Sequence, residues 1–165
     1  MPTTTEIRAG ERLGQLPDRG DETLFFIGTI RTPWPSRRDC PRKGDLDGPP
    51  CQIVVDPRWL EALADIAGHE YLQILYWMHE ARRDLLQQSP RSNGQATGTF
   101  ALRSPNRPNP IASSLVVLKK VEGNVLTVRG LDCIDGTPLI DIKPDTCPHW
   151  LGQEAGQTQK KVGEA

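Results

Sequence analysis

The amino-acid sequence predicts a mainly β protein, a small closed or nearly closed β-barrel with one or two short helices. Several short segments rich in β-branched and aromatic residues follow one another along the chain. Glycine, proline, Asn and Asp residues typical of turns separate these segments, and one segment has helical spacing. With 165 residues, the chain has the length of one domain.

Each predicted strand is bounded by its own stop signal. Leu24–Thr32 is β-rich and Pro33 ends it, while Cys51–Val55 is a second short strand. The apolar run Tyr71–His79 suits a buried strand or a buried helix, and we favour a strand because the preceding helix ends at Gly68. Alternate residues of such a strand share one face, namely Leu72, Ile74, Tyr76 and Met78.

One helix and a hairpin complete the predicted elements. Asp56 can cap a helix that has Pro57 at its first position and Gly68 at its close. The last three strands are predicted at Leu115–Val121, Val125–Gly130 and Leu139–Ile142. The first two of these form a hairpin, because turn residues separate them.

Composition predicts three parts of the chain. Residues 1–23 form a flexible N-terminal segment, 24–145 the barrel domain and 146–165 a flexible C-terminal tail, since both ends are poor in apolar residues. Within the domain, residues 33–50 form a loop rich in Pro, Gly and Arg. A loop of that length in a compact domain is usually functional or mobile.

Charge and cysteine content exclude several classes of protein. The formal net charge is −1 and the sequence pI is near 6.3, unlike a protein that binds nucleic acid through bulk positive charge. No apolar run is long enough to span a bilayer, and the first 20 residues lack a signal peptide. The four cysteines form no C-x-x-C pair, which favours reduced thiols over a zinc site or a disulfide framework. These features predict a cytoplasmic protein without a metal.

Polar residues gather in turns, whereas the standard catalytic motifs are absent. The proline turn, residues 103–110, holds Arg103 and Arg107 on a stiff backbone. These guanidinium groups suit a carboxylate or phosphate ligand, and equally suit capping of nearby carbonyl groups. A second cluster carries Asp132, Asp135 and Asp141, which can bind a cation, steady the arginines or simply form turns. The arginines of the 33–50 loop suit a solvated surface.

Three motifs identify a resemblance to a known family. Residues 98–112 read G-T-F-A-L-R-S-P-N-R-P-N-P-I-A, residues 131–138 read L-D-C-I-D-G-T-P, and residues 141–144 read D-I-K-P. Residues 27–33, I-G-T-I-R-T-P, match the opening strand of the same pattern. The chain thus resembles the TsaA-like family, whose characterised members, called TrmO, are S-adenosylmethionine-dependent tRNA methyltransferases. The resemblance covers residues 26–144.

The resemblance implies a homodimeric barrel, a non-Rossmann methyltransferase, with S-adenosyl-L-methionine near the subunit interface. The implied cofactor-binding residues are Pro41, Arg42, Lys43, His79, Glu80, Arg103, Gly130, Leu131, Asp132, Cys133 and Ile134. The implied reaction methylates the N6 nitrogen of threonylcarbamoyladenosine, next to the anticodon of tRNA. This amide-like nitrogen needs help to lose its proton, for which the candidates are His79, Asp132 and Asp141. Arg37, Arg38 and Arg107 are the candidates for contact with RNA phosphates in the anticodon loop.

The chain departs from the family pattern in places that bear on the substrate. Ala112 stands where Gly is usual, Leu102 where Thr is common, and Asp145 where Tyr usually follows D-I-K-P. The segment after His79 is shorter than in long bacterial members, and their C-terminal extension is missing. Two alternatives to tRNA methylation therefore stay open. One is a non-catalytic barrel that binds a partner, with or without S-adenosylmethionine, and the other is a methyltransferase acting on a different amine.

Overall fold

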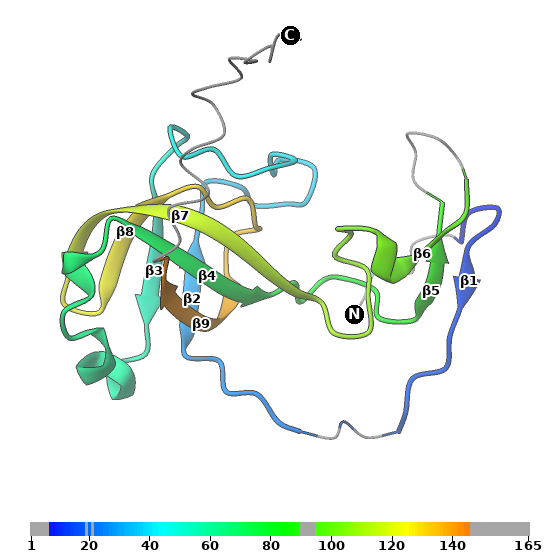
Figure 1. Ribbon diagram of the computed structural model, residues 1–165, viewed down its shortest axis with the longest axis horizontal. Helices are drawn as coiled ribbons and strands as arrows, with labels where there is room; N and C mark the ends of the chain where they lie inside the picture. Colours follow the sequence, from blue (N-terminus) through cyan, green and yellow to red (C-terminus); the bar gives the residue numbers. More distant parts are fainter. Residues whose placement is uncertain (1–6, 19, 21, 90–94, 146–165) are drawn as a thin grey trace, which may run out of the picture.

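The computed structural model describes residues 7–18, 20, 22–89 and 95–145. Within these residues, six antiparallel strands close into a barrel in the order β2-β3-β8-β7-β4-β9 (Figure 1). The strands are β2 (Gly28–Arg31), β3 (Cys51–Val55), β4 (Tyr71–Trp77), β7 (Ile111–Glu122), β8 (Val125–Arg129) and β9 (Thr137–Pro144). The predicted closed β-barrel is thereby confirmed.

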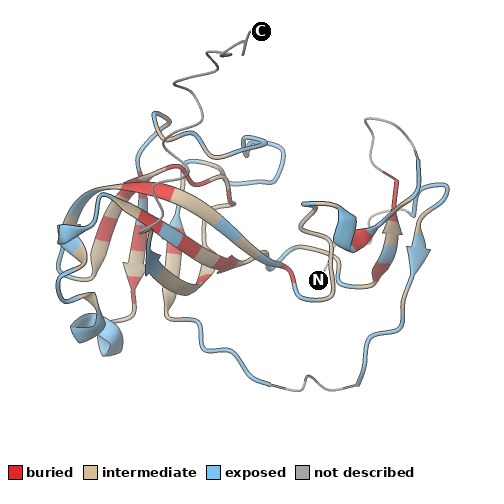
Figure 2. Ribbon diagram, viewed as in Figure 1, coloured by how far each residue is buried: buried red, intermediate tan, exposed pale blue. Residues whose placement is uncertain are grey.

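The barrel interior holds the hydrophobic core (Figure 2). Strand β4 shows why the sequence builds it, since Leu72, Ile74 and Tyr76 point inward and are buried. The same alternation buries Ile53 on β3 and Leu126 on β8. The predicted strand is confirmed for Tyr71–Trp77, with Leu72, Ile74 and Tyr76 on one face, whereas Met78 and His79 lie beyond its end.

The first predicted strand is shorter than expected. It begins at Gly28 rather than Leu24, and Phe25 upstream is 73% exposed. The reason lies in its partner, because β3 ends at Val55 and the chain then turns into a helix. The backbone upstream of Ile27 therefore has no neighbouring strand in β3 with which to pair.

The predicted helix forms, but as two short 3₁₀ segments. These are η1 (Pro57–Leu63) and η2 (Ile66–Gly68). Asp56 caps η1 as predicted, since its side chain accepts a hydrogen bond from the Arg58 backbone N–H at 3.0 Å. Asp65 between them has a φ of +63°, which interrupts the helix. Gly68 closes η2 without the positive φ of a glycine cap.

A second, smaller sheet escaped the sequence analysis. We call it the satellite sheet; it consists of β1 (Arg12–Leu13), β5 (Leu85–Gln88) and β6 (Thr97–Gly98), in the order β1-β5-β6. Figure 1 shows it beside the barrel, beyond the ends of β4 and β7, with η3 (Thr99–Ala101) packed next to it. Strand β1 lies inside the segment 1–23 that composition predicts to be flexible. The domain boundaries stay a prediction, and the tail 146–165 falls outside the described residues.

The antiparallel pairing divides the barrel into two ends. One end of the barrel carries the 33–50 loop and the start of β3. The last residues of β4 and β8 and the first residues of β7 lie at this same end. We call this the loop end. The β7–β8 turn, η1 and η2 lie at the opposite end. Among the described residues, no helical segment has both the length and the apolar character needed to cross a bilayer.

Candidate functional site

A pair of hydroxyl groups, from the buried Tyr76 and the half-buried Ser114, holds the carboxylate of Asp132 at the loop end. The Tyr76 hydroxyl, at the end of β4, donates to Asp132 Oδ1 at 2.7 Å. The Ser114 hydroxyl, near the start of β7, donates to the same oxygen at 3.3 Å and lies 2.9 Å from the Tyr76 hydroxyl. Since both hydroxyls use Oδ1, the arrangement fixes the orientation of the carboxylate while Oδ2 accepts no hydrogen bond from the described residues.

Electrostatics keep the Tyr76 hydroxyl protonated. Burial raises the pKa of Tyr76 far above its ordinary value, and the negative charge of Asp132 raises it further. Tyr76 is 2% exposed, so its hydroxyl needs a protein partner. Tyr76 therefore acts as a permanent hydrogen-bond donor to Asp132.

The 33–50 loop packs directly on the segment that carries Asp132. A Cβ atom at Gly44 would lie 1.9 Å from the Gly130 carbonyl oxygen, so the two backbones touch where only glycine fits. Gly130 has a φ of +113°, and a Cβ there would lie 2.6 Å from the Leu115 carbonyl oxygen. The Gly44 contact, together with the hydrogen bond from Arg129 Nη1 to the Asp47 carbonyl at 3.1 Å, places the loop beside the start of residues 130–134. Two of the segments implied to bind the cofactor are thus brought together by the fold.

Three carboxylates lie near the Cys40 thiol, where the loop meets the segment that carries Asp132. Burial raises the pKa of its thiol, and the negative charges of Asp132, Asp39 and Glu80 raise it further, against the opposing charge of Arg37. The loop, the end of β4 and the segment after β8 therefore contribute to one electrostatic site. Two carboxylates, those of Asp132 and Glu80, lie close enough to act on one thiol.

Backbone and side-chain contacts fix the residues that follow Asp132. The Thr32 hydroxyl donates to the Cys133 carbonyl at 2.9 Å, and the Thr32 N–H donates to Asp135 Oδ1 at 3.0 Å. The Asp135 N–H in turn donates to the Trp34 carbonyl at 2.8 Å, while the Trp34 side chain packs against the core. Asp135 also forms an exposed ion pair with Arg31 at 3.5 Å. Asp135 therefore secures a turn and an arginine, and Trp34 anchors the loop.

The three described cysteines are free thiols, and the two buried ones are poorly reactive. Burial raises the pKa of Cys51 to about 11 and that of Cys133 to about 12. Both thiols stay protonated at neutral pH, which removes the nucleophilic form. Within the described residues, no group of three or more His, Cys, Asp or Glu residues is arranged to hold a metal ion. Cys147 lies outside the described residues.

The proline turn has two arginines in different roles. Arg107 donates from Nε to the Ser104 carbonyl at 2.8 Å and from Nη2 to the Leu102 carbonyl, so it clamps the backbone on both sides of Arg103. Arg103 itself is exposed. The carbonyl-capping alternative therefore describes Arg107, while the side chain of Arg103 extends from the clamped turn into solvent. The implied contact of Arg107 with RNA stays a prediction.

The remaining sequence-predicted residues lie in three places. His79 and Glu80 are exposed in the turn after β4, where the Ala81 N–H donates to the Met78 carbonyl at 2.9 Å. Arg37, Arg38, Pro41, Arg42 and Lys43 are exposed on the loop. Asp141 lies in the middle of β9 opposite Leu75, and its carboxylate forms an ion pair with Lys143 at 2.7 Å. Because Leu75 is on the outward row of β4, Asp141 is on the outer surface of the barrel, separate from the Tyr76–Ser114–Asp132 cluster.

Sequence reasoning missed Tyr76 and Ser114 as part of the site. A signal for Tyr76 was present, because a tyrosine among the inward residues of an apolar strand needs a partner for its hydroxyl. Ser114 gave no comparable signal. Its partners Tyr76 and Asp132 are 38 and 18 residues away in the sequence.

The chain matches the family model described as the tRNA-methyltransferase O N-terminal domain over residues 29–147. It is 50% identical over 142 residues to a probable S-adenosyl-L-methionine-binding protein, VirR, of Rhizobium radiobacter, covering 86% of this chain and 81% of that protein. A shorter match, 56% identical over 57 residues, is to a tRNA (adenine(37)-N6)-methyltransferase of Mus musculus, covering 34% of this chain and 13% of that protein.

A solved structure shares the fold. The crystal structure of TrmO from Pseudomonas aeruginosa superposes with a TM-score of 0.63 at 30% sequence identity. The match covers 86% of this chain and 61% of that one, so the chain spans less than two thirds of the solved protein.

Proposed function

Because the chain belongs to the tRNA-methyltransferase O N-terminal domain family, we propose that it is an S-adenosylmethionine-dependent tRNA adenine-N6 methyltransferase. The finer proposal is that it methylates N6 of threonylcarbamoyladenosine next to the anticodon. The observation that carries the proposal is the contact of Gly44 with Gly130, because it sets the loop against the start of residues 130–134. These are the segments for which the family resemblance implies cofactor binding.

The chemistry of the loop end fits this cofactor. S-adenosylmethionine carries a positive sulfonium and ammonium together with a negative carboxylate. The carboxylates of Asp132 and Glu80, which lie near Cys40, favour the positive groups. Arg103 supplies the planar donor group that suits the carboxylate, and the backbone of residues 130–134 supplies donors and acceptors for the adenine. When bound, the cofactor supplies an already activated methyl group.

The protein's own residues then have two tasks. They align the acceptor nitrogen with the methyl group while excluding water, and they remove a proton from that nitrogen. His79 and Asp132 can take the proton, because both belong to the loop end. Asp141 is a weaker candidate, since its carboxylate forms an ion pair with Lys143 on the outer surface.

The RNA-binding part of the proposal rests on the exposed loop. Arg37 and Arg38 are exposed beside the candidate site, where they can contact phosphates of a single-stranded loop. Arg107 has two donors occupied by carbonyl groups and contributes chiefly through its remaining N–H groups. A homodimer and a cytoplasmic location remain part of the same proposal.

Titration calorimetry with S-adenosylmethionine tests the cofactor site. Asp132→Asn should weaken binding by roughly 10- to 150-fold, because it removes the charge from a hydrogen-bonded carboxylate. Asp141→Asn is the matched control and should bind as the unaltered protein does. A folded protein that binds no S-adenosylmethionine, or an unchanged affinity in Asp132→Asn, would contradict the proposed site.

Methyl transfer to tRNA tests the reaction. Transfer to tRNA that carries the threonylcarbamoyl group, and not to the same tRNA without it, supports the finer proposal. Transfer to neither RNA, by a protein that binds the cofactor, would overturn the tRNA assignment and favour another amine substrate. At saturating S-adenosylmethionine, His79→Ala and Asp132→Asn identify the proton acceptor, because loss of a general base slows transfer by about 10²- to 10⁴-fold.

A further inference from the structure

One buried amide bridges the two sides of the segment that carries Arg103. Gln88, on β5, is 3% exposed. Its Nε2 donates to the Thr99 hydroxyl at 3.0 Å and to the Asn106 carbonyl at 2.7 Å. Both N–H groups of the amide are thereby used, and the residues they hold lie four before and three after Arg103.

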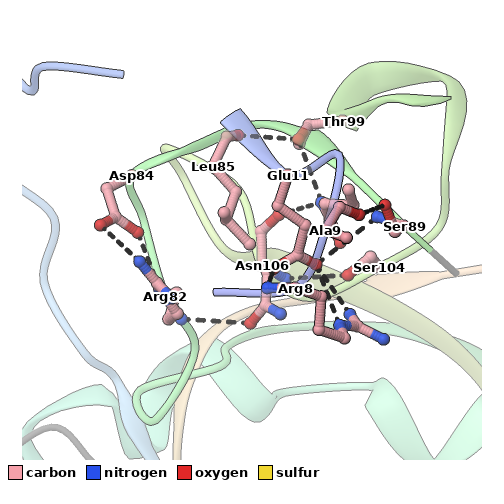
Figure 3. A network of polar contacts seen from close by, with 11 residues as sticks. Arg8, Ala9, Glu11, Arg82, Asp84, Leu85, Ser89, Thr99, Ser104 and Asn106 are labelled. Atoms are coloured by element: carbon pink, nitrogen blue, oxygen red, sulfur yellow. Dashed lines mark hydrogen bonds and ion pairs between the residues drawn. The ribbon is translucent and has the colours of Figure 1, made fainter. Parts of the chain in front are cut away.

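Further contacts fix the same segment. The Thr99 hydroxyl donates to the Leu85 carbonyl at 2.7 Å, and the Arg82 N–H donates to Asn106 Oδ1 at 3.2 Å (Figure 3). Arg107 clamps the carbonyl groups on either side of Arg103 from within the turn. The backbone of Arg103 is consequently held from β5, from the chain before β5 and from the turn itself.

A separate contact joins the turn to the barrel. Arg83 donates from Nε to the Pro108 carbonyl at 2.6 Å, and its guanidinium lies 5.4 Å from the centre of the Trp77 ring at the end of β4. The Met78 N–H donates to the Pro110 carbonyl at 2.8 Å. The proline turn is therefore attached to the barrel at one side and to the satellite sheet at the other.

The N-terminal segment is hydrogen-bonded to β5 and to the residue that follows it. The Ser89 hydroxyl donates to the Ala9 carbonyl at 2.7 Å, and strand β1 pairs with β5. The Glu11 carboxylate, whose side chain is 3% exposed, accepts from the Arg8 N–H at 3.0 Å (Figure 3). Polar contacts thus continue from residue 8 to the proline turn.

We propose that the satellite sheet is a brace that positions Arg103 for the cofactor carboxylate, with Gln88 as the positioning residue. The inference rests on the proposed function, in which Arg103 binds that carboxylate. Ordering an exposed arginine on a ligand costs both backbone and side-chain entropy, and a backbone that is already fixed removes the backbone part of that cost. Gln88 does this without touching the ligand, because its amide is occupied by Thr99 and Asn106.

Hydrogen exchange of the cofactor-free protein tests the brace directly. In Gln88→Met, which keeps the length of the side chain but removes the amide, the hydrogen-bonded backbone amides of Leu102 and Asn106 should exchange about tenfold faster. Gln87→Met, the neighbouring position on the same strand, is the control and should leave them unchanged. Unchanged exchange in Gln88→Met would overturn the proposal. Thr99→Val, which removes one partner of the amide, gives the same test if Gln88→Met does not fold.

Affinity for S-adenosylmethionine tests whether Gln88 acts on cofactor binding through Arg103. Gln88→Met should weaken binding about tenfold in the unaltered protein and less than about twofold in Arg103→Ala, because the two changes act on one interaction. A merely structural role would lower the melting temperature and leave the two effects independent. Equal weakening in both backgrounds would therefore overturn the inference.

The same measurements separate this inference from the proposed function. If Arg103→Ala leaves the affinity unchanged while Gln88→Met still speeds exchange at Leu102 and Asn106, the proposed role of Arg103 in cofactor binding fails. The satellite sheet then holds the proline turn rigid, but not for the cofactor carboxylate. If Arg103→Ala weakens binding and Gln88→Met changes neither exchange nor affinity, the cofactor assignment stands and the brace fails.

Discussion

The barrel and the satellite sheet are stabilised by different forces. The core cluster of the barrel consists of buried apolar side chains with one tyrosine, whereas Leu85 is the buried apolar residue of the satellite sheet among the described residues. The satellite region instead buries Gln88, Ser89 and Thr99. Apolar burial is non-directional and contributes most of the folding free energy, while hydrogen bonds contribute little net but fix geometry. The barrel therefore provides most of the stability, and the satellite sheet fixes the position of the proline turn.

The contrast extends to how each region uses its polar groups. In the barrel, a part-buried polar cluster, Tyr76 with Ser114 and Asp132, lies at the loop end where the candidate site is. In the satellite sheet, polar groups form the interior itself. Among the described residues, no buried side-chain nitrogen or oxygen is left without a partner. Fully satisfied networks of this kind rigidify a structure, which suits a region that holds a turn in place.

The largest effect should come from the barrel core. Leu126→Ala, at a fully buried position on β8, should lower the free energy of unfolding by about 2–5 kcal/mol, because it removes apolar contacts and leaves a cavity. Urea unfolding measures it. Leu86→Ala on β5, where the leucine is 53% exposed, is the control and should change stability by less than about 0.5 kcal/mol. A comparable loss of unfolding free energy in both variants would contradict the conclusion that the barrel core supplies most of the stability.

A smaller, local effect should follow from Ser89→Ala. This change removes the hydrogen bond to the Ala9 carbonyl and should weaken the satellite sheet by about 1 kcal/mol. Amide exchange should accelerate in β1 and β5 and stay constant in the barrel strands. The exposed Ser113 on β7, which accepts from Gln73 at 3.0 Å, provides the matched comparison. Ser113→Ala should leave exchange in both regions unchanged; acceleration throughout the barrel in Ser89→Ala would show that the two regions unfold together.

The smallest effect should be a selective response of the satellite sheet to acid. Burial raises the pKa of Glu11, but hydrogen bonds from the backbone N–H groups of Arg8 and Ser89 outweigh it and hold the pKa below its ordinary 4.5. A hydrogen bond from Arg82 likewise lowers the pKa of Asp84. Because the folded values lie below the unfolded ones, this stabilisation is complete above about pH 4.5 and is lost as pH falls through the folded values.

Amide hydrogen exchange in β1 and β5 measures this response. It is followed from pH 6 downwards and corrected for the intrinsic rate of exchange. Protection in the satellite sheet should fall below about pH 4.5 before protection in the barrel does. Glu11→Gln should flatten the pH dependence, because the titrating carboxylate is gone. A simultaneous loss in both regions, or an unchanged profile in Glu11→Gln, would contradict the assignment of this response to Glu11.

The sequence by itself determined where most of the barrel strands lie and which residues to propose for part of the candidate site. Alternating apolar residues in β3 and β4 and the turn between β7 and β8 are local signals, and local signals suffice for elements with one buried face. The family motifs also identified Asp132 and Arg103. These conclusions needed only residues that are neighbours in the chain.

Tertiary structure alone decided the rest. The satellite sheet is made of strands of two to four residues, too short for a periodic signal. Asp65 breaks the expected helix through its backbone angle, and Arg107 proved to clamp carbonyl groups rather than extend freely. Tyr76 and Asp132 meet across 56 residues of sequence. The Asp65 backbone angle and the Arg107 hydrogen bonds are local features without a periodic sequence signal. The Tyr76–Asp132 contact and the β1–β5 pairing join groups far apart in the sequence, so only the folded chain brings them together.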